Sequence, residues 1–432
     1  MSAVLLGCGQ LIPNYDSSPT PPSTLSTSGR SGDFAFESLF AVSLSVDLAL
    51  FDYDGMEIET DSTPAIVSVT SGGSNVYRGA ATAEHGMETT LQVPADWQKL
   101  TITVDKAGFE SQRFVVDDPA GLSTINIRAN MVRGGISTQL SGEQDTDLDG
   151  IPDIYDAAPD DADYAFSLTV PTDGYITVAY EDNFPHIGDG DYNDFVAGYS
   201  ATAHANGSGV TSLEIDVNAR ARVAGYDHEF GFLVKMPGLC GTLKVEITDP
   251  VSGTVTTAID GAVISDPSGE GVRIPVFTST KDAFTKTGPA PGGLDNGDPD
   301  YLNSVGHEAN IRIYQIRAID SRNPPDPWMV ELPPFDPYLI PQTGYDVHLI
   351  GKPALDGSKN YEVPLAEWED FRDPAGFPRA LLVPTDWGHP AETLHIEEAY
   401  PDFRTWRESE GDQKSDWYLR PEPGLVVYPP VR

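Results

Sequence analysis

The chain has 432 residues, of which 66 are acidic and 26 are basic, so its formal net charge is −40. This balance excludes nucleic acid as a partner, because its phosphates require Lys and Arg, and it disfavours electrostatic binding to an anionic membrane surface. Part of the acidity can also reflect solubility or adaptation to salty surroundings. Turn-forming residues are abundant and long helix-forming stretches are rare. The composition therefore predicts a mainly β protein, with a small N-terminal β-sandwich and a larger β-rich, sandwich-like C-terminal domain that has few short helices.

The N-terminal segment contains a possible lipidation site. Residues 5–8 read LLGC, which resembles a bacterial lipobox in which the cysteine, here Cys8, receives the lipid. No basic segment and only a few apolar residues precede it, so either the true start lies upstream or the likeness is accidental. We favour the upstream start, because residues 16–32 are rich in Ser, Thr, Pro and Gly. Residues 1–33 are thus predicted to be a truncated lipoprotein signal and a disordered tether. Cys240 is expected to be a buried, unpaired residue.

Residues 34–132 alternate between apolar and polar side chains, which predicts a small β-sandwich domain. We find no candidate site there and expect a spacer or an adhesive module. Residues 77–79 and 108–109 are expected to be turns. Strands are predicted at residues 42–48, 65–69, 89–93, 100–104 and 124–127.

Residues 133–163 form an acidic linker whose central segment, residues 145–156, reads DTDLDGIPDIYD. Acidic side chains stand at loop positions 1, 3, 5, 9 and 12, with Gly150 at position 6 for a sharp turn, which is the arrangement that surrounds Ca²⁺ with oxygen. The alternative is an exposed acidic linker with a chance pattern. The predicted ligands are Asp145, Asp147, Asp149, the backbone carbonyl of Ile151, Asp153 and Asp156.

The flanking helices of an EF-hand are excluded by Pro152 and Pro159. The segment instead resembles a thrombospondin type 3 calcium loop. That resemblance implies that Ca²⁺ stiffens the linker and fixes the angle between the flanking domains.

Residues 164–432 are predicted to form one large β-rich domain. Ile396, Ala399, Phe403 and Trp406 share one face of a short predicted helix. The Gly- and Pro-rich residues 288–301 are expected to be a loop. Strands are predicted at residues 165–170, 174–180, 195–203, 210–221, 231–235, 241–248, 272–277 and 310–316.

A second acidic cluster follows the predicted strand that ends at Tyr180. A second oxygen cage for a metal ion is one interpretation of this cluster. The alternative is a tight turn in which Asp and Asn side chains accept hydrogen bonds from backbone amides. The candidate ligands are Glu181, Asp182, Asp189, Asp191, Asn193 and Asp194.

Several segments of this domain resemble the LruC domain family of bacterial envelope and surface proteins. The resemblance covers roughly residues 165–417 and implies a lipoprotein-like protein without known catalysis. Residues 225–232 depart from the family pattern at His228 and Glu229, which places any site near that strand in doubt. The matching segments are residues 180–185 (YEDNFP), 190–196 (GDYNDFV), 344–353 (GYDVHLIGKP), 378–384 (PRALLVP) and 399–403 (AYPDF), followed by Trp406.

No catalytic motif is visible in the sequence. His228-Glu229 and His307-Glu308 lack the second histidine that a zinc protease requires, and no nucleophile elbow or phosphate loop occurs. Several tryptophans could form a sugar-stacking surface, although core packing is the more common use. These tryptophans are Trp368, Trp387, Trp406 and Trp417.

The sequence therefore predicts a calcium-binding, non-catalytic envelope or surface lipoprotein with a structural or adhesive role. It is expected outside the cytoplasm, attached to the membrane only through its lipid, with a protein, matrix or polysaccharide partner. The alternatives are a secreted carbohydrate-active hydrolase with structural calcium and a soluble secreted protein without an anchor.

Overall fold

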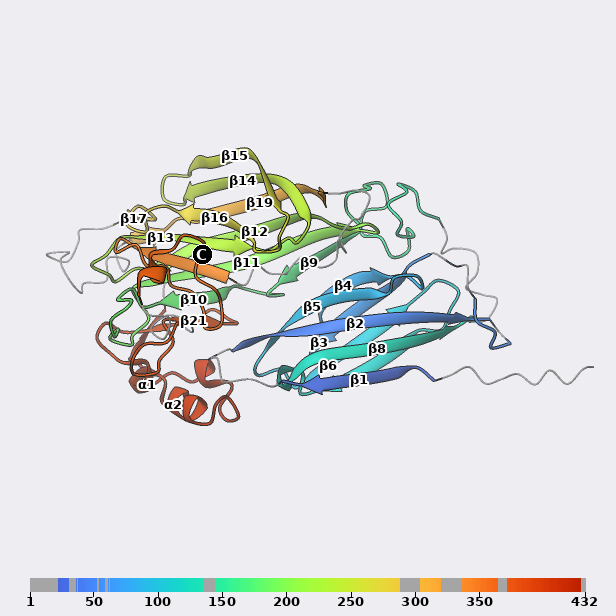
Figure 1. Cartoon of the computed structure of the whole chain (residues 1–432), viewed down its shortest axis with the longest axis horizontal. Coiled ribbons are helices and arrows are strands. Elements are labelled where there is room, and N and C mark those ends of the chain that lie inside the picture. The colour runs from blue at the N-terminus through green and yellow to red at the C-terminus, as the bar shows by residue number, and fades with distance from the viewer. Residues whose placement is uncertain are drawn as a thin grey trace, which may run out of the picture.

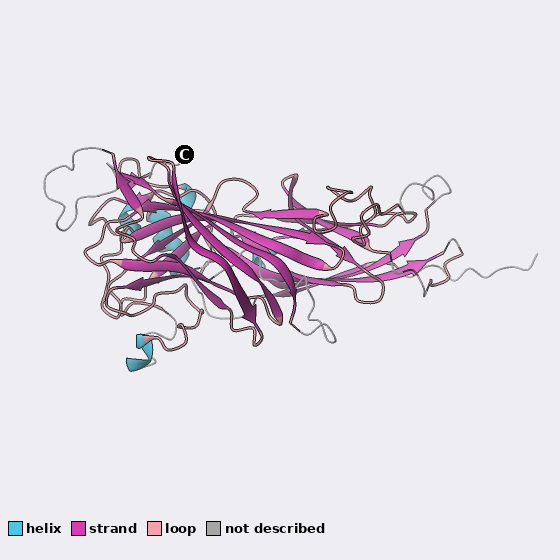
Figure 2. Ribbon diagram, turned by 90° about the horizontal axis from the view of Figure 1, so that it is seen from above, coloured by secondary structure: helices cyan, strands magenta, loops and turns pink. Residues whose placement is uncertain are grey.

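The computed structural model describes residues 22–30, 36, 38–52, 54–58, 61, 63–134, 144–287, 304–319, 336–363 and 371–428. Strands dominate this part of the chain, and the few helices gather mainly at one end of the molecule (Figure 1, Figure 2), so the predicted β-rich fold is confirmed. None of the described helices is long and apolar enough to span a membrane. Cys8, Trp368 and the predicted loop at residues 288–301 lie outside the described residues.

The N-terminal unit is a sandwich of two four-stranded sheets, ordered β1-β8-β2-β5 and β4-β3-β6-β7. Alternate residues of β2, such as Val42, Leu44 and Val46, are buried in its core, as period-two strands require. β2 and β8 pair in parallel, whereas their other neighbours are antiparallel. The strands are β1 (Thr24–Gly29), β2 (Leu39–Phe51), β3 (Ala65–Ser71), β4 (Ser74–Ala81), β5 (Met87–Pro94), β6 (Lys99–Asp105), β7 (Gln112–Asp117) and β8 (Leu122–Val132).

Two predictions for this unit are corrected. The tether predicted at residues 1–33 contains strand β1, whose six residues are all exposed and pair antiparallel with β8. Backbone hydrogen bonds to β8 hold this segment, although its Ser- and Thr-rich sequence buries no apolar face. Residues 77–79, predicted as a turn, lie inside β4, where Tyr77 is buried in the sandwich core.

The larger unit consists of an eight-stranded sheet and a three-stranded sheet that face each other. The first has the order β15-β14-β19-β12-β11-β10-β21, with β9 paired beside β11, and the second has the order β16-β13-β20. Aromatic side chains join the two sheets: Phe230 of β13 packs 5.2 Å from Phe195 of β11, and Phe232 packs 5.1 Å from Tyr199, measured between ring centroids. β4 of the N-terminal unit neighbours β9 of the larger unit (Figure 1).

The sequence did not predict seven of the described strands of the larger unit, namely β15, β17, β18, β20, β21, β22 and β23. The described strands of this unit are β9 (Phe166–Val170), β10 (Ile176–Tyr180), β11 (Phe195–Asn206), β12 (Gly209–Ala221), β13 (His228–Val234), β14 (Leu239–Asp249), β15 (Thr254–Asp266), β16 (Val272–Phe277), β17 (Phe284–Lys286), β18 (Ser304–Gly306), β19 (Glu308–Ala318), β20 (Asp336–Pro341), β21 (Ala380–Val383), β22 (His389–Pro390) and β23 (Val426–Val427).

Two short helices, α1 (Ile396–Ala399) and α2 (Pro401–Glu408), cover one end of the eight-stranded sheet. The four residues predicted to share a helix face are all buried in the cluster that packs there against Ala179 of β10. Pro401 begins α2, where its missing N–H costs no hydrogen bond. Because Ala179 faces these helices and Val178 faces the opposite core, both sides of β10 are covered and all five of its residues are buried.

Candidate metal centres

The first acidic segment is held against the larger unit. The Gly207 N–H, in the turn between β11 and β12, donates to the Asp149 carbonyl over 3.2 Å, and the Asn206 amide donates to the Ala162 carbonyl over 2.7 Å. The side chain of Ile151 is fully buried in the core of the larger unit. A Cβ at Gly207 would lie 2.6 Å from the Asp149 carbonyl oxygen, so this close approach requires glycine.

Three predicted ligands of this segment divide their carboxylate oxygens in the same way. One oxygen accepts a backbone N–H: Gly150 donates to Asp145 (3.0 Å), Asp149 to Asp147 (3.2 Å) and Ile151 to Asp149 (2.7 Å). The other oxygen of each carboxylate is buried and has no hydrogen-bond partner among the described residues. One oxygen from each of the three carboxylates can be chosen so that all lie within 4.8 Å of one another, which suits a single divalent cation.

The remaining two acidic residues of the loop behave differently from each other. Asp156 accepts the Ala158 N–H over 2.7 Å with one oxygen and also leaves its second oxygen buried without a partner. Asp153 uses both oxygens to accept the backbone N–H and the hydroxyl of Thr146, each over 2.8 Å. Asp153 therefore closes the loop, and Asp156 adds a fourth free oxygen at the edge of the first cluster.

Electrostatics in this loop favour a cation. Burial raises the pKa of Asp149 to about 6, and Asp147, Asp156 and Asp145 raise it further by repulsion. Burial also raises the pKa of Asp156, and repulsion from Asp147, Asp153 and Asp145 raises it further. A cluster of carboxylate oxygens of this kind is the donor set that a hard cation such as Ca²⁺ requires.

The second cluster joins the end of β10 to the loop before β11. Glu181, Asp189 and Asp191 can each offer an oxygen within 4.8 Å of the others. Glu181 is only 4% exposed; its Oε1 accepts the Tyr192 N–H over 2.8 Å, while Oε2 is buried without a described partner. Burial and the two aspartates raise the pKa of Glu181 to about 8, and burial and Asp189 raise that of Asp191 to about 7.

The loop of this second cluster is fixed by its contacts with the segment before α1. The Thr393 N–H donates to Asp191 Oδ2 over 2.9 Å, and the Ile396 N–H donates to the Gly190 carbonyl over 2.7 Å. Gly190 adopts a φ of 80°, which favours glycine. Glu392, also in this segment, has a raised pKa through burial and the nearby Asp189. Sequence reasoning missed Glu392, because it lies about two hundred positions away in a segment without a motif.

The other predicted residues of the second cluster have different partners. Asp182 Oδ2 lies 2.8 Å from His228 Nε2. The backbone N–H of Asp182 donates to Asp194 Oδ2 over 2.7 Å. Asn193 donates to Glu392 Oε2 over 3.2 Å. The structure therefore brings three of the six predicted ligands together and places the other three in adjoining hydrogen bonds. Of these three, only Asp194 accepts a backbone N–H, which is the kind of contact that the alternative for this segment described.

Three of the four tryptophans that the sequence suggested for sugar stacking do not form such a surface. Trp387, Trp406 and Trp417 are buried and pack against one another and Tyr400. The surface they would have offered to a carbohydrate is therefore used in the core.

Comparisons with known proteins show a similarity of fold and assign no role. Residues 208–418, somewhat less than half of the chain, match the model of a family described as "Domain of unknown function (DUF4842)". A solved structure named "Putative lipoprotein from Bacteroides ovatus" is 15% identical, covers 85% of this chain and 100% of its own, and has a TM-score of 0.51, so it is similar in fold. A carbohydrate-binding module from the beta-sandwich super family is 12% identical over 69% of this chain and 94% of its own, with a TM-score of 0.15 that supports no conclusion. No curated protein matches the chain. The LruC and thrombospondin type 3 resemblances stay predictions.

Proposed function

We propose that this protein is a calcium-binding, non-catalytic surface or envelope lipoprotein with a structural or adhesive role. The observation that supports calcium most directly is the set of four buried carboxylate oxygens in the first loop, on Asp145, Asp147, Asp149 and Asp156, that have no hydrogen-bond partner among the described residues. Burying such oxygens without a partner is costly, and one cation could bind the oxygens of Asp145, Asp147 and Asp149, which lie within 4.8 Å of one another. Glu181 Oε2 supports a second ion by the same reasoning.

Calcium titration by calorimetry of the metal-depleted protein tests this proposal. We expect two binding steps, and the free energy of unfolding should rise by about 2.7 kcal/mol per site when free Ca²⁺ is about 100 times Kd. Replacing Asp147 and Asp149 together by Asn should remove one step, and Glu181→Gln should remove the other. Asp160→Asn is the matched control, because Asp160 lies in the same segment but is exposed. An isotherm that is the same for all three variants and the native protein would refute both sites.

Lipidation at Cys8 is the second part of the proposal. It is supported by the lipobox-like sequence and agrees with the name of the Bacteroides ovatus protein of similar fold. We expect metabolic labelling with an alkyne fatty acid, in cells that express the gene with its upstream codons, to label the protein. Cys8→Ser should abolish the label, and Cys240→Ser should retain it. A label that persists in Cys8→Ser would contradict this assignment.

The hydrolase alternative has less support. It requires an open groove lined by tryptophan around a pair of carboxylates. Trp387, Trp406 and Trp417 are buried, and among the described residues the groups of three acidic side chains that could hold a metal are the two clusters assigned to metal. The non-catalytic role is therefore the one that we propose.

A further inference from the structure

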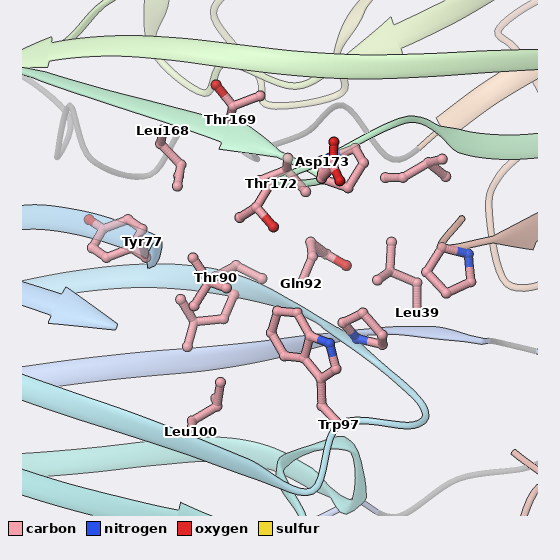
Figure 3. A pocket seen from close by; sticks show the side chains of 17 residues that line it. Leu39, Tyr77, Thr90, Gln92, Trp97, Leu100, Leu168, Thr169, Thr172 and Asp173 are labelled. Atoms are coloured by element: carbon pink, nitrogen blue, oxygen red, sulfur yellow. The ribbon is translucent and has the colours of Figure 1, made fainter. Parts of the chain in front are cut away.

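A pocket lies between the N-terminal sandwich and the larger unit. Its volume is about 170 Å³, and it is lined on one side by β5 and the loop after it and on the other by β9 and residues 171–173. Figure 3 shows Gln92 and Trp97 on the sandwich side, with Thr172 and Asp173 facing them from the other. Pockets between domains are common places for small ligands.

Polarity in this pocket changes from its floor to its rim. Leu91, Leu100 and Ile176 line the floor and are buried, whereas Thr172 and Asp173 at the rim are exposed. A ligand that fits this gradient has an apolar side turned inward and polar groups turned outward.

Two half-buried side chains between floor and rim define the chemistry further. Trp97 offers an aromatic ring. The loop that carries it is fixed by a hydrogen bond of 3.1 Å from the backbone N–H of Trp97 to the Pro94 carbonyl. The Nε2 atom of Gln92 is buried and has no hydrogen-bond partner among the described residues. A wholly apolar ligand would leave that donor unpaired, which is unfavourable.

Charge and size restrict the ligand class. The lining contains one carboxylate, Asp173, and neither Lys nor Arg, so an anionic ligand would find no counter-charge. The volume compares with the roughly 150 Å³ of an engineered cavity that holds one benzene ring. The pocket therefore suits a single uncharged ring that has hydroxyl groups at its edge.

From this geometry we propose that the pocket binds one neutral pyranose residue, as the end or a branch of a glycan. The C–H face of the sugar stacks on Trp97, a hydroxyl accepts from Gln92 Nε2, and outer hydroxyls donate to Asp173. This inference supplies a ligand class for the adhesive part of the proposed function and rests on it. It does not depend on the lipid or on the calcium sites.

The test uses the calcium-saturated full chain and saturation-transfer NMR with methyl glycosides of glucose, galactose, mannose and N-acetylglucosamine. At least one glycoside should give a signal with Kd near the millimolar range expected for a single sugar, about 1–10 mM. Trp97→Ala should weaken binding roughly tenfold, because the stacking surface is removed. Val115→Ala, on β7 and 42% exposed, is the control and should bind like the native protein.

Thr172→Trp guards against misfolding of the Trp97 variant, because Thr172 is exposed and a large side chain there should fill the mouth without disturbing the core. Its expected result is loss of sugar binding with an unchanged Tm. The inference is overturned if no glycoside binds, or if Thr172→Trp binds the glycosides as well as the native protein does. It is also overturned if the pocket binds an apolar probe such as indole and none of the sugars. Calcium isotherms recorded on the same samples separate the two ideas: a native protein that binds calcium but none of the glycosides refutes this inference alone.

Discussion

Each carboxylate in the first cluster has one oxygen that orders the backbone and one that faces its neighbours. Gly150, Asp149 and Ile151 donate their N–H groups to three successive aspartates, so the loop conformation itself points the remaining oxygens together. Glu181 repeats this arrangement with the Tyr192 N–H. The local sequence thus brings these oxygens together without an ion, at the cost of repulsion between the carboxylates.

Burial of these carboxylates, together with their mutual repulsion, predicts an unusual pH dependence for the metal-depleted protein. Glu181, Asp191 and Asp149 have folded-state pKa values raised to about 8, 7 and 6. A carboxyl whose pKa is raised by folding stabilises the fold fully below its unfolded pKa, and that stability is lost as pH rises through the folded value. We therefore expect the Tm without metal to fall between pH 5 and 8, and saturating Ca²⁺ to reduce this fall.

Scanning calorimetry on native protein and Glu181→Gln measures this effect. Burial lowers the pKa of His228, so this residue makes the Tm rise with pH near the ordinary pKa of histidine. Comparison with Glu181→Gln is therefore needed to isolate the contribution of the carboxyl. The variant should show a shallower fall, since each pKa unit corresponds to about 1.4 kcal/mol. Identical profiles of Tm against pH for the two proteins would show that the pKa of Glu181 is not raised by folding in the absence of metal.

His348 is a second residue whose role rests on charge. Burial alone would lower its pKa, but Asp336 at 2.6 Å and Asp346 at 2.9 Å raise it to about 9. The imidazolium joins β20 to the segment after it. His348→Gln should cost about 3–5 kcal/mol in urea unfolding near neutral pH, because two buried carboxylates lose their cation.

The cost of His348→Gln should also depend on pH. The stabilisation by His348 is complete below the unfolded histidine value and is lost as pH rises through about 9, so the difference between variant and native protein should shrink there. His85→Gln is the control, since His85 is 78% exposed and its contact with Glu84 is worth little. A constant difference across this range would argue against a charged His348.

At the scale of elements, the sequence pattern predicted several strands whose alternate residues enter a core. β2, β5 and β12 show such period-two burial, which is visible in the sequence. β1 and β15 are almost entirely exposed and are held by backbone pairing with β8 and β14. No burial pattern marks such strands, because a partner strand far along the chain determines them.

The same distinction explains the success and the limits of the site prediction. Asp145, Asp147 and Asp149 come together through one tight loop, so spacing alone was informative. The diversion of Asp153 to Thr146 and the arrival of Glu392 depend on hydrogen bonds and packing that spacing does not encode.

The loop of the second cluster supplies a prediction at this scale. A Cβ at Gly188 would lie 1.8 Å from Glu181 Oε2, so Gly188→Ala should displace either the loop or the glutamate. We expect a loss of about 1–3 kcal/mol in stability, as for overpacked cores, together with a weaker second calcium step in calorimetry.

Gly29→Ala is the matched control for this substitution. A Cβ there meets nothing within 4 Å and its φ is not in the left-handed region, so stability and calcium binding should be nearly unchanged. Equal calcium isotherms for Gly188→Ala and the native protein would show that Glu181 does not need its present position to bind metal.

At the scale of the whole molecule, both clusters lie on the larger unit, and the first is fixed to the turn between β11 and β12. The core of the larger unit also includes Leu39, Ile66 and Ala80 from the N-terminal sandwich. Calcium in the first loop would therefore stiffen a segment that is already docked beside the junction of the two units, in contrast to an isolated linker.

The net charge of −40 allows two sources of instability without metal, and they respond differently to salt. Repulsion among exposed carboxylates is screened, because the Debye length falls from about 10 Å at 0.1 M to about 3 Å at 1 M. Asp149 and Glu181 are 7% and 4% exposed, and buried charges are screened much less.

If the two clusters cause most of the instability without metal, micromolar to millimolar Ca²⁺ should restore the Tm, and choline chloride at about 1 M should restore only a small part of it. The variant with both Asp147→Asn and Asp149→Asn should already be partly restored without either addition, because its charges are gone. Scanning calorimetry of these samples decides the matter: full recovery in choline chloride alone would mean that the acidity serves solubility and that the clusters contribute little to stability.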